Sequence, residues 1–406
     1  MLTLTVSELG RRLLTPRDPL PEAPPVDLER YFTAEEIARG ARFARPQLAL
    51  ALARAAVDVG ALSLVVLRPP RLFARVDPVI AGAAAGAGLA VALSLPSLPL
   101  AAIARRRAIG AGLVTQSWPG WAVDLTKANA IQAAFAAAGG ETMVLITRRY
   151  PSTWWLPAAA ASVLVGGVFA ALAPVLLDPV FNSFTPLPEG ETRSDVLALA
   201  NAAGVEVGEV FSVDASRRTT AANAYVTGLG PTKRVVLYDT LLDRYSRDEV
   251  RVVVAHELAH VRNRDVPRSV LYGALIAPAL AFTVQQLSWR LSDERGTAGA
   301  LPALALATAV ISAPIGLVGN RLSRALELRA DAFSLELSGS PNAFVSFERT
   351  IALQNVADLD PPRWVRTLIS THPPAAERIA AAVAWSGPVQ EREITPVQSC
   401  RTPAGS

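Results

Sequence analysis

The chain is poor in cysteine, histidine and charge. Its 406 residues include one cysteine and three histidines, and charged residues make up only 18% of the sequence. The single cysteine, Cys400, excludes an intrachain disulfide bond and any metal site built from several cysteines. Hydrophobic residues make up 51% and the mean hydropathy is +0.31, a balance too apolar for an ordinary soluble protein of this length. We therefore expect an integral membrane protein.

Six apolar segments are long enough to cross a bilayer as helices. They occupy approximately residues 46–67, 79–103, 128–146, 154–177, 266–287 and 300–317. The third segment is the weakest, because it carries Glu141 and two adjacent glycines. Such a segment is either a span that faces a protein interior or a helix that lies on the membrane surface, and we favour the span.

The distribution of arginine predicts the orientation in the membrane. Residues 1–45 lack a continuous apolar core and carry several arginines, so we expect no cleavable signal peptide and a cytoplasmic amino terminus. With six spans, the arginine triplet at 105–107 and the polar region 178–265 also fall on the cytoplasmic side, as the positive-inside rule prefers, although the arginines within 68–75 fall opposite. The pI of about 9.5 indicates contact with anionic lipid headgroups and not with nucleic acid, for which no motif occurs.

Two of the three histidines stand one helical turn apart, and a glutamate follows the first directly. Residues i and i+4 of an α-helix share a face, so the imidazoles of His256 and His260 can hold one tetrahedral Zn²⁺. Glu257 can then polarise the metal-bound water. The alternative is a pair of histidines that merely satisfies a buried helix. Because histidine is so scarce in this chain, the pattern favours a zinc site of the peptidase type.

The flanking residues indicate that this segment is a helix. Ser246 and Glu249 have the spacing of a capping box at its start. The apolar Val250, Val254 and Leu258 fall on the face opposite the two histidines, which leaves the histidine face free to meet a cleft. Glu249 shares the histidines' face but lies roughly 10 Å along the helix, too far to be a third metal ligand.

A small sheet is predicted before this helix. The pattern indicates a helix over residues 192–203, strands over 209–214, 222–227 and 233–238, and a hairpin turn at 228–231. Zinc peptidases commonly bind an extended substrate along a sheet edge. Asn223, Ala224 and Tyr225 are the candidate edge, and an ordinary β-hairpin is the alternative.

Two segments compete for the third zinc ligand. Glu327 and Asp331 lie one turn apart in a stretch of strong helix formers that follows the last apolar segment. Glu327 could bind zinc while Asp331 accepts the outer N–H of a ligand histidine. The alternative for this pair is a solvated charged face. His372, within residues 371–379, is the rival ligand or a stabiliser of the transition state.

The motifs together resemble those of the integral-membrane gluzincin peptidases typified by the type I CAAX prenyl protease. The resemblance extends over residues 31–384. The motifs occur in the family's order, namely Phe184-Thr185-Pro186-Leu187, Asn223-Ala224-Tyr225, residues 235–242, His256 to His260, Ser323-Arg324 with Glu327, Ala330 and Asp331, and His372-Pro373 with Arg378. Any one of them could arise by chance, but the set is specific.

The resemblance implies a zinc endopeptidase with one zinc ion per chain. In such an enzyme Glu327 is the third ligand, and Glu257 is the general base that assists attack of a zinc-bound water on the peptide bond. His372 and Arg378 stabilise the oxyanion or hold the site in place. Asp331 supports a ligand.

The resemblance also implies the fold and the substrates. It predicts a mainly α, polytopic membrane protein, a bundle or barrel of about six transmembrane helices with a small α+β zincin-like catalytic domain. Residues 223–225 would line peptide or protein substrates, among them lipid-modified or membrane-tethered ones. The alanine and arginine content resembles that of a high-GC bacterium, which favours a bacterial plasma membrane but not a prenylated substrate. A quality-control endopeptidase without prenyl specificity is therefore the alternative.

The expected domains follow the order of these motifs. They are a cytoplasmic N-terminal segment (1–45), transmembrane helices 1–4 (46–178), a catalytic part with the sheet and the zinc helix (179–265), transmembrane helices 5–6 (266–319), a second catalytic part with the third-ligand helix and His372 (320–386), and a disordered tail (387–406). The alternative from another class is an inactive scaffold or a transporter. A structural zinc normally has four protein ligands, but the sequence offers three. Transporters usually show repeated halves, and we find no such repeat in the sequence.

Overall fold

The computed structural model of the chain describes residues 1–18, 23–68, 76–228 and 233–390. The chain divides into two compact units, and the division falls within two long helices. The first, called here the helical unit, consists of Met1–Thr15, Gln47–Phe181 and Val266–Leu322. The second, called the mixed unit, consists of Pro16–Pro46, Asn182–Asp265 and Ser323–Ser406. The segment 1–45, predicted as one N-terminal segment, is thus shared between the two units.

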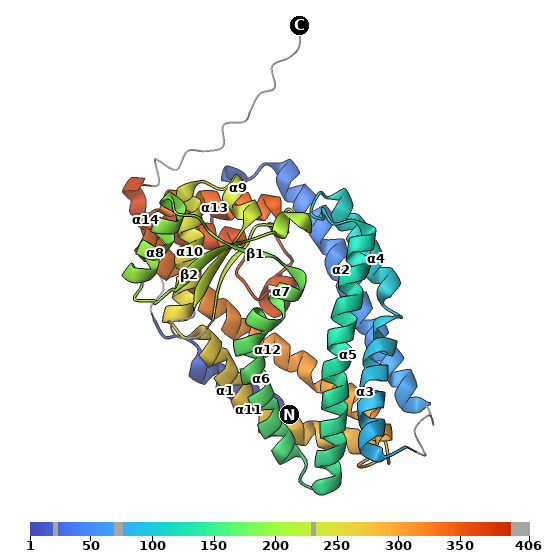
Figure 1. Cartoon of the computed structure of the whole chain (residues 1–406). Helices are drawn as coiled ribbons and strands as arrows, with labels where there is room; N and C mark the ends of the chain where they lie inside the picture. The colour runs from blue at the N-terminus through green and yellow to red at the C-terminus, as the bar shows by residue number, and fades with distance from the viewer. Residues whose placement is uncertain (19–22, 69–75, 229–232, 391–406) are drawn as a thin grey trace. The chain divides into compact units, whose positions relative to one another are not determined.

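The helical unit contains the long apolar helices together with a few short ones (Figure 1). They are α1 (Leu2–Leu14), most of α2 (Ala34–Leu67), α3 (Pro78–Ser94), α4 (Leu98–Gly110), α5 (Trp118–Arg149), α6 (Trp155–Leu176), α7 (Asp178–Phe181), α11 (Asp265–Leu291) and the first part of α12 (Leu301–Ser338). Local signals start several of them. Asp77 caps α3 by accepting from the N–H groups of Val79 and Ile80, and Ser117 caps α5 by accepting from Gly120.

In the part of the chain that the structure describes, five helices are long and apolar enough to cross a membrane, or six if one bent pair counts as a span. The prediction of about six apolar spans is therefore confirmed. The uncertain third segment lies inside α5, which qualifies by length and composition. The predicted span over 79–103 is instead the bent pair, because α3 and α4 meet at 48°. Pro96 lies in the break, and a proline there cannot continue the hydrogen bonds of α3.

Glycines allow α3 and α5 to approach closely, and the two helices lie side by side (Figure 1). A Cβ atom at Gly86 would lie 2.1 Å from the carbonyl oxygen of Ala136, and one at Gly140 would lie 2.3 Å from that of Gly82. These neighbours are backbone atoms, which cannot rotate away. Small residues at such contacts are typical of helix packing in membranes.

Gly86→Ala should therefore destabilise the protein. The added methyl group must push α3 and α5 apart, at a cost of about 1 to 3 kcal/mol. Gly88→Ala is the matched control, because a Cβ atom there meets nothing within 4 Å and alanine is the better helix former. We expect a lower melting temperature in detergent for Gly86→Ala alone. Equal melting of the two variants would show that this contact does not support the fold.

The mixed unit is built on a four-stranded sheet with the order β1-β2-β4-β3. The strands are β1 (Phe184–Pro186), β2 (Glu209–Val213), β3 (Ala224–Thr227) and β4 (Arg234–Tyr238). β2 pairs with β4 in parallel, and the other two pairs are antiparallel. The three predicted strands are all present, with small differences at their ends. β1 was not predicted, because three residues are too few for a periodic pattern. Most of the predicted turn at 228–231 lies outside the described residues.

Helices cover this sheet and complete the core. They are α8 (Glu191–Ala202), α9 (Asp239–Arg244), α10 (Arg247–Arg262), α13 (Pro341–Gln354) and α14 (Ala375–Gln390), with the start of α2, the end of α12, the short 3₁₀ helices Leu28–Arg30 and Ala215–Arg217, and a π-helical turn at Val365–Ile369. The predicted tail from 387 begins inside α14, and residues 391–406 lie outside the described residues.

Part of the N-terminal segment belongs to the core of the mixed unit. Phe32 is 1% exposed and packs in the same cluster as α8, α10 and α13. The carbonyl of Tyr31 accepts a hydrogen bond of 2.8 Å from Arg349 Nε, and Arg45 pairs with Asp358 at 2.8 Å. This segment therefore helps to fix α13 and the loop that follows it.

Candidate active site

The helix α10 carries the two histidines, and its start is fixed by the predicted capping box. Ser246 accepts from the N–H of Glu249, and the Glu249 carboxylate accepts from the N–H of Ser246. Val254 and Leu258 are fully buried on the opposite side, as expected. The Nε2 atoms of His256 and His260 lie 3.2 Å apart. The apolar face thus fixes the helix, and the polar face brings two imidazole nitrogens to one point.

An aspartate carboxylate contacts the Nδ1 atom of each imidazole. Nδ1 of His256 lies 2.9 Å from Asp331 Oδ1, and Nδ1 of His260 lies 2.9 Å from Asp265 Oδ2. An ionised carboxylate can only accept, so each Nδ1 carries a hydrogen, and in the neutral imidazole that binds a metal each Nε2 then presents its lone pair. This carboxylate–histidine arrangement is the usual support of histidine ligands to a metal.

Glu327 completes the group from α12. Its Oε2 lies 3.2 Å from His256 Nε2, and its Oε1 lies 3.7 Å from His260 Nε2. Ligands at 2.0–2.1 Å from a tetrahedral zinc are about 3.3 Å apart. Oε2 of Glu327 is also buried without a good hydrogen bond among the described residues. The three side chains therefore fit a divalent metal ion.

Glu257 lies beside this group. One oxygen of its carboxylate and one nitrogen of each histidine fall within 4.8 Å of one another. The shorter distances favour Glu327 as the acidic ligand and leave Glu257 free for proton transfer. Burial raises the pKa of the Glu257 carboxyl, which makes its carboxylate a stronger base.

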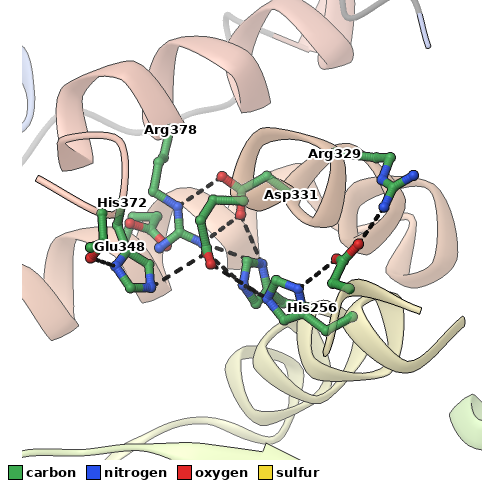
Figure 2. A network of polar contacts seen from close by, with 10 residues as sticks. His256, Arg329, Asp331, Glu348, His372 and Arg378 are labelled. Atoms are coloured by element: carbon green, nitrogen blue, oxygen red, sulfur yellow. Dashed lines mark hydrogen bonds and ion pairs between the residues drawn. The ribbon is translucent and has the colours of Figure 1, made fainter. Parts of the chain in front are cut away.

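Arg378 points at carboxylates and not at open space (Figure 2). Its Nε and Nη2 both donate to the carboxylate of Asp331, the first at 2.8 Å, and its Nη1 lies 2.6 Å from Glu348 Oε1. Its side chain is only 14% exposed. Of the two predicted roles for Arg378, this geometry favours holding the site in place, through Asp331 and His256, over direct contact with an oxyanion.

Glu348, on α13, was not predicted from the sequence. It is 2% exposed, and burial raises the pKa of its carboxyl to about 7, against the influence of the Arg378 charge. A single glutamate in an amphipathic helix gives no signal in one sequence. Only the packing of α13 against α14 shows that it lies behind the site.

A second chain of polar contacts supports His260. It, too, was not predicted from the sequence. Asp265 lies just beyond the end of α10. Arg264, which precedes it, has a positive φ of 55°. Arg329, two residues after Glu327 on α12, donates to Asp265. The two histidines are therefore held alike, each by an aspartate that is itself paired with an arginine.

His372 lies on the open side of the group. Its Nε2 is 3.5 Å from Glu327 Oε2, and its side chain is 63% exposed. The π-helical turn before it is fixed by Arg324, which donates to the carbonyls of Thr367 and Ser370 at 2.8 and 2.5 Å. Of its two predicted roles, this exposure favours contact with a substrate over metal binding.

The predicted substrate segment lies beside the histidine helix, because β3 packs against α10. The carbonyl of Asn223 accepts from the N–H of Tyr238 at 3.0 Å, so this residue continues the pairing of β3 with β4. Ala224 is buried and Tyr225 is partly exposed. As predicted, β3 is an end strand of the described sheet.

Glu348→Ala should weaken catalysis without contact between Glu348 and a substrate. Arg378 would lose one of its two carboxylates, so Asp331 and His256 would be held less firmly, and losses of about 10- to 100-fold in activity or metal affinity are usual for such changes. The matched control is Glu336→Ala, an exposed position on α12. The measurements are kcat, KM and zinc affinity, and unchanged kcat and zinc affinity in Glu348→Ala would contradict this role.

Comparisons with known proteins agree with this site. The model of peptidase family M48 matches residues 186–386. The uncharacterized metalloprotease YhfN of Bacillus subtilis is 30% identical over 303 residues, which are 72% of this chain and 71% of that protein. A CAAX prenyl protease 1 homolog of Oryza sativa is 31% identical over 222 residues, 53% of this chain and 52% of the rice protein.

A solved structure confirms the fold. The crystal structure of Ste24p from S. mikatae matches with a TM-score of 0.76 at 20% identity, covering 94% of this chain and 96% of that chain. The likeness to YhfN extends over most of both proteins, and the family model covers the histidine helix, Glu327 and the His372 segment. The chain therefore belongs to peptidase family M48 and is a membrane metalloprotease that resembles the CAAX prenyl proteases.

Proposed function

We propose that the chain is a zinc-dependent endopeptidase with His256, His260 and Glu327 as the metal ligands. The observation that carries this proposal is the convergence of three possible ligand atoms, two imidazole nitrogens and a carboxylate oxygen, at the separations of a tetrahedral zinc site. Three protein ligands leave a coordination position for chemistry, whereas a structural zinc site is normally closed by four.

Each residue of the site has a separate role in the proposed reaction. Zinc bound at this point would supply Lewis-acid chemistry for the scissile carbonyl and for water. Glu257 takes the proton from the attacking water and delivers it to the leaving amine. His372, exposed beside Glu327, donates a hydrogen bond to the oxygen that gains charge. Asp331 and Asp265 keep both imidazoles aimed at one point.

The substrate is an extended peptide segment of a membrane-tethered or lipid-modified protein. The edge strand beside α10 contains or adjoins Asn223, Ala224 and Tyr225. Backbone hydrogen bonds along such an edge can bind peptides of many sequences. The apolar spans of the same chain keep the enzyme in the bilayer with such substrates. We place it in a bacterial plasma membrane with the mixed unit on the cytoplasmic side, because the arginine triplet at 105–107 then meets the positive-inside rule.

The test is cleavage of a matched peptide pair by the purified protein in detergent. One peptide carries a farnesylated CAAX end, and the other has the same sequence without the lipid. We expect a zinc chelator to abolish cleavage and added zinc to restore it. Preference for the farnesylated peptide supports prenyl specificity, and equal cleavage supports a general membrane endopeptidase. Cleavage that resists the chelator would overturn the zinc mechanism.

A further inference from the structure

The first helix of the chain, α1, buries its small polar side chains and exposes its leucines, which is the reverse of a helix at the surface of a soluble protein. Thr3 and Ser7 are 3% and 0% exposed, and Gly10 is buried on the same face. Leu9 and Leu13 are 66% and 62% exposed. A helix at the surface of a soluble protein buries its leucines and exposes its hydroxyl groups. The environment of α1 must therefore be one that accepts leucine.

The buried face of α1 packs on α11 within the helical unit. Thr3 Oγ1 donates to the carbonyl of Ala279 at 3.2 Å, and the hydroxyl groups of Ser7 and Tyr272 lie 2.7 Å apart. A Cβ atom at Gly10 would lie 3.4 Å from the Tyr272 ring, an ordinary contact distance, so the two helices touch at this residue. Small residues and hydroxyl bonds at such a contact are characteristic of helices that associate in a membrane.

The exposed leucines of α1 continue an apolar surface that α11 already presents. α11 is one of the helices that qualify as a span. Its own exposed side chains include Val266, Leu271 and Leu275, at 58%, 48% and 39%. α1 lies against the part of α11 between Arg268, which donates to the carbonyl of Leu14, and Ala279. Leu275 lies directly beside α1, because a Cβ atom at Gly10 would be 3.9 Å from its Cδ1, so apolar side chains of the two helices adjoin there.

We propose that the leucine face of α1 contacts the acyl chains of bilayer phospholipids. This face consists of Leu2, Leu9 and Leu13, which lie within about 40° of one another around the helix axis and are all exposed. Burying one leucine side chain in hydrocarbon is worth about 1.5 to 3 kcal/mol relative to water. The N-terminal residues are then embedded in the membrane and are not part of a cytoplasmic segment.

Charge and length fix how α1 enters the bilayer. Thirteen residues span roughly 20 Å as a helix, which is less than the hydrocarbon core of about 30 Å. α1 is therefore a partial insertion and not a further span. At its C-terminal end, Glu8 pairs with Arg11 and Arg12, each at 2.7 Å. This group has a net positive charge, which suits the level of anionic headgroups.

Single-cysteine spin labelling tests the proposal in the full-length protein in liposomes of phosphatidylethanolamine and phosphatidylglycerol. A Cys400→Ser background has no other cysteine, so one label each can be attached through Leu9→Cys, Leu13→Cys and, as an aqueous control, Glu336→Cys. We expect the labels on α1 to collide with oxygen at least several-fold more than with a water-soluble nickel chelate, and the control label to show the reverse.

Two results would overturn the proposal. Collision with nickel at positions 9 and 13 as frequent as at position 336 would place the leucine face in water. Low collision with both oxygen and nickel would show that another protein surface covers it. Because both leucines are exposed, labelling them should leave the fold intact, and unchanged peptidase activity checks that it does.

Discussion

Glu257→Gln should retain zinc and lose peptidase activity by about 100- to 10,000-fold, the usual contribution of general acid–base catalysis. Glutamine has nearly the same size as glutamate but cannot take a proton from water. The metal should remain, because the carboxylate nearest to the Nε2 atoms of both histidines is that of Glu327, at 3.2 and 3.7 Å. The measurements are turnover of the unlipidated or farnesylated peptide and zinc content of the purified variant.

The control for Glu257→Gln is the melting temperature in detergent. Burial raises the pKa of the Glu257 carboxyl, so the ionised side chain is costly to the fold and its neutral replacement should not lower stability. A variant with a lower melting temperature would lose activity because it is less stably folded and not because it lacks a general base. Undiminished turnover by a correctly folded, zinc-loaded variant would remove Glu257 from the mechanism.

The parts of the site that sequence predicted are those encoded locally. The histidine pair, the capping box at Ser246 and the apolar face of α10 all follow from the 3.6-residue period of one helix. The strands β2, β3 and β4 follow from short-range patterns as well. The long apolar segments predicted the candidate spans, because a bilayer requires a run of hydrophobic residues wherever the helices pack.

The parts that sequence missed depend on contacts between distant segments. Glu348 lies 30 residues before Arg378 in the chain, and only the packing of α13 against α14 brings them to 2.6 Å. Asp265 is different, because it follows His260 by five residues, and a search for a carboxylate just beyond the helix could have found it. The insertion that we propose for α1 was not predicted from the sequence, because the leucines of a short helix interrupted by polar residues do not form a long apolar run.

Glu327→Ala should remove most of the zinc, from about one ion per chain to a small fraction of that, and abolish peptidase activity. The two imidazoles that remain would leave a site with only two protein ligands, whereas catalytic zinc sites normally have three. The protein should stay folded, because shortening Glu327 removes a carboxylate oxygen that is buried without a good hydrogen bond. Zinc content and melting temperature are the measurements.

His372→Ala is the matched control for Glu327→Ala. His372 is 63% exposed and lies 3.5 Å from Glu327, so we expect this variant to keep its zinc and to lose kcat with little change in KM, as expected for a group that acts mainly in the transition state. The two ligand hypotheses that the sequence left open thus predict opposite results. If Glu327→Ala keeps its zinc and His372→Ala loses it, the third ligand is the histidine, and Glu327 must be assigned to the support of His256 and His260.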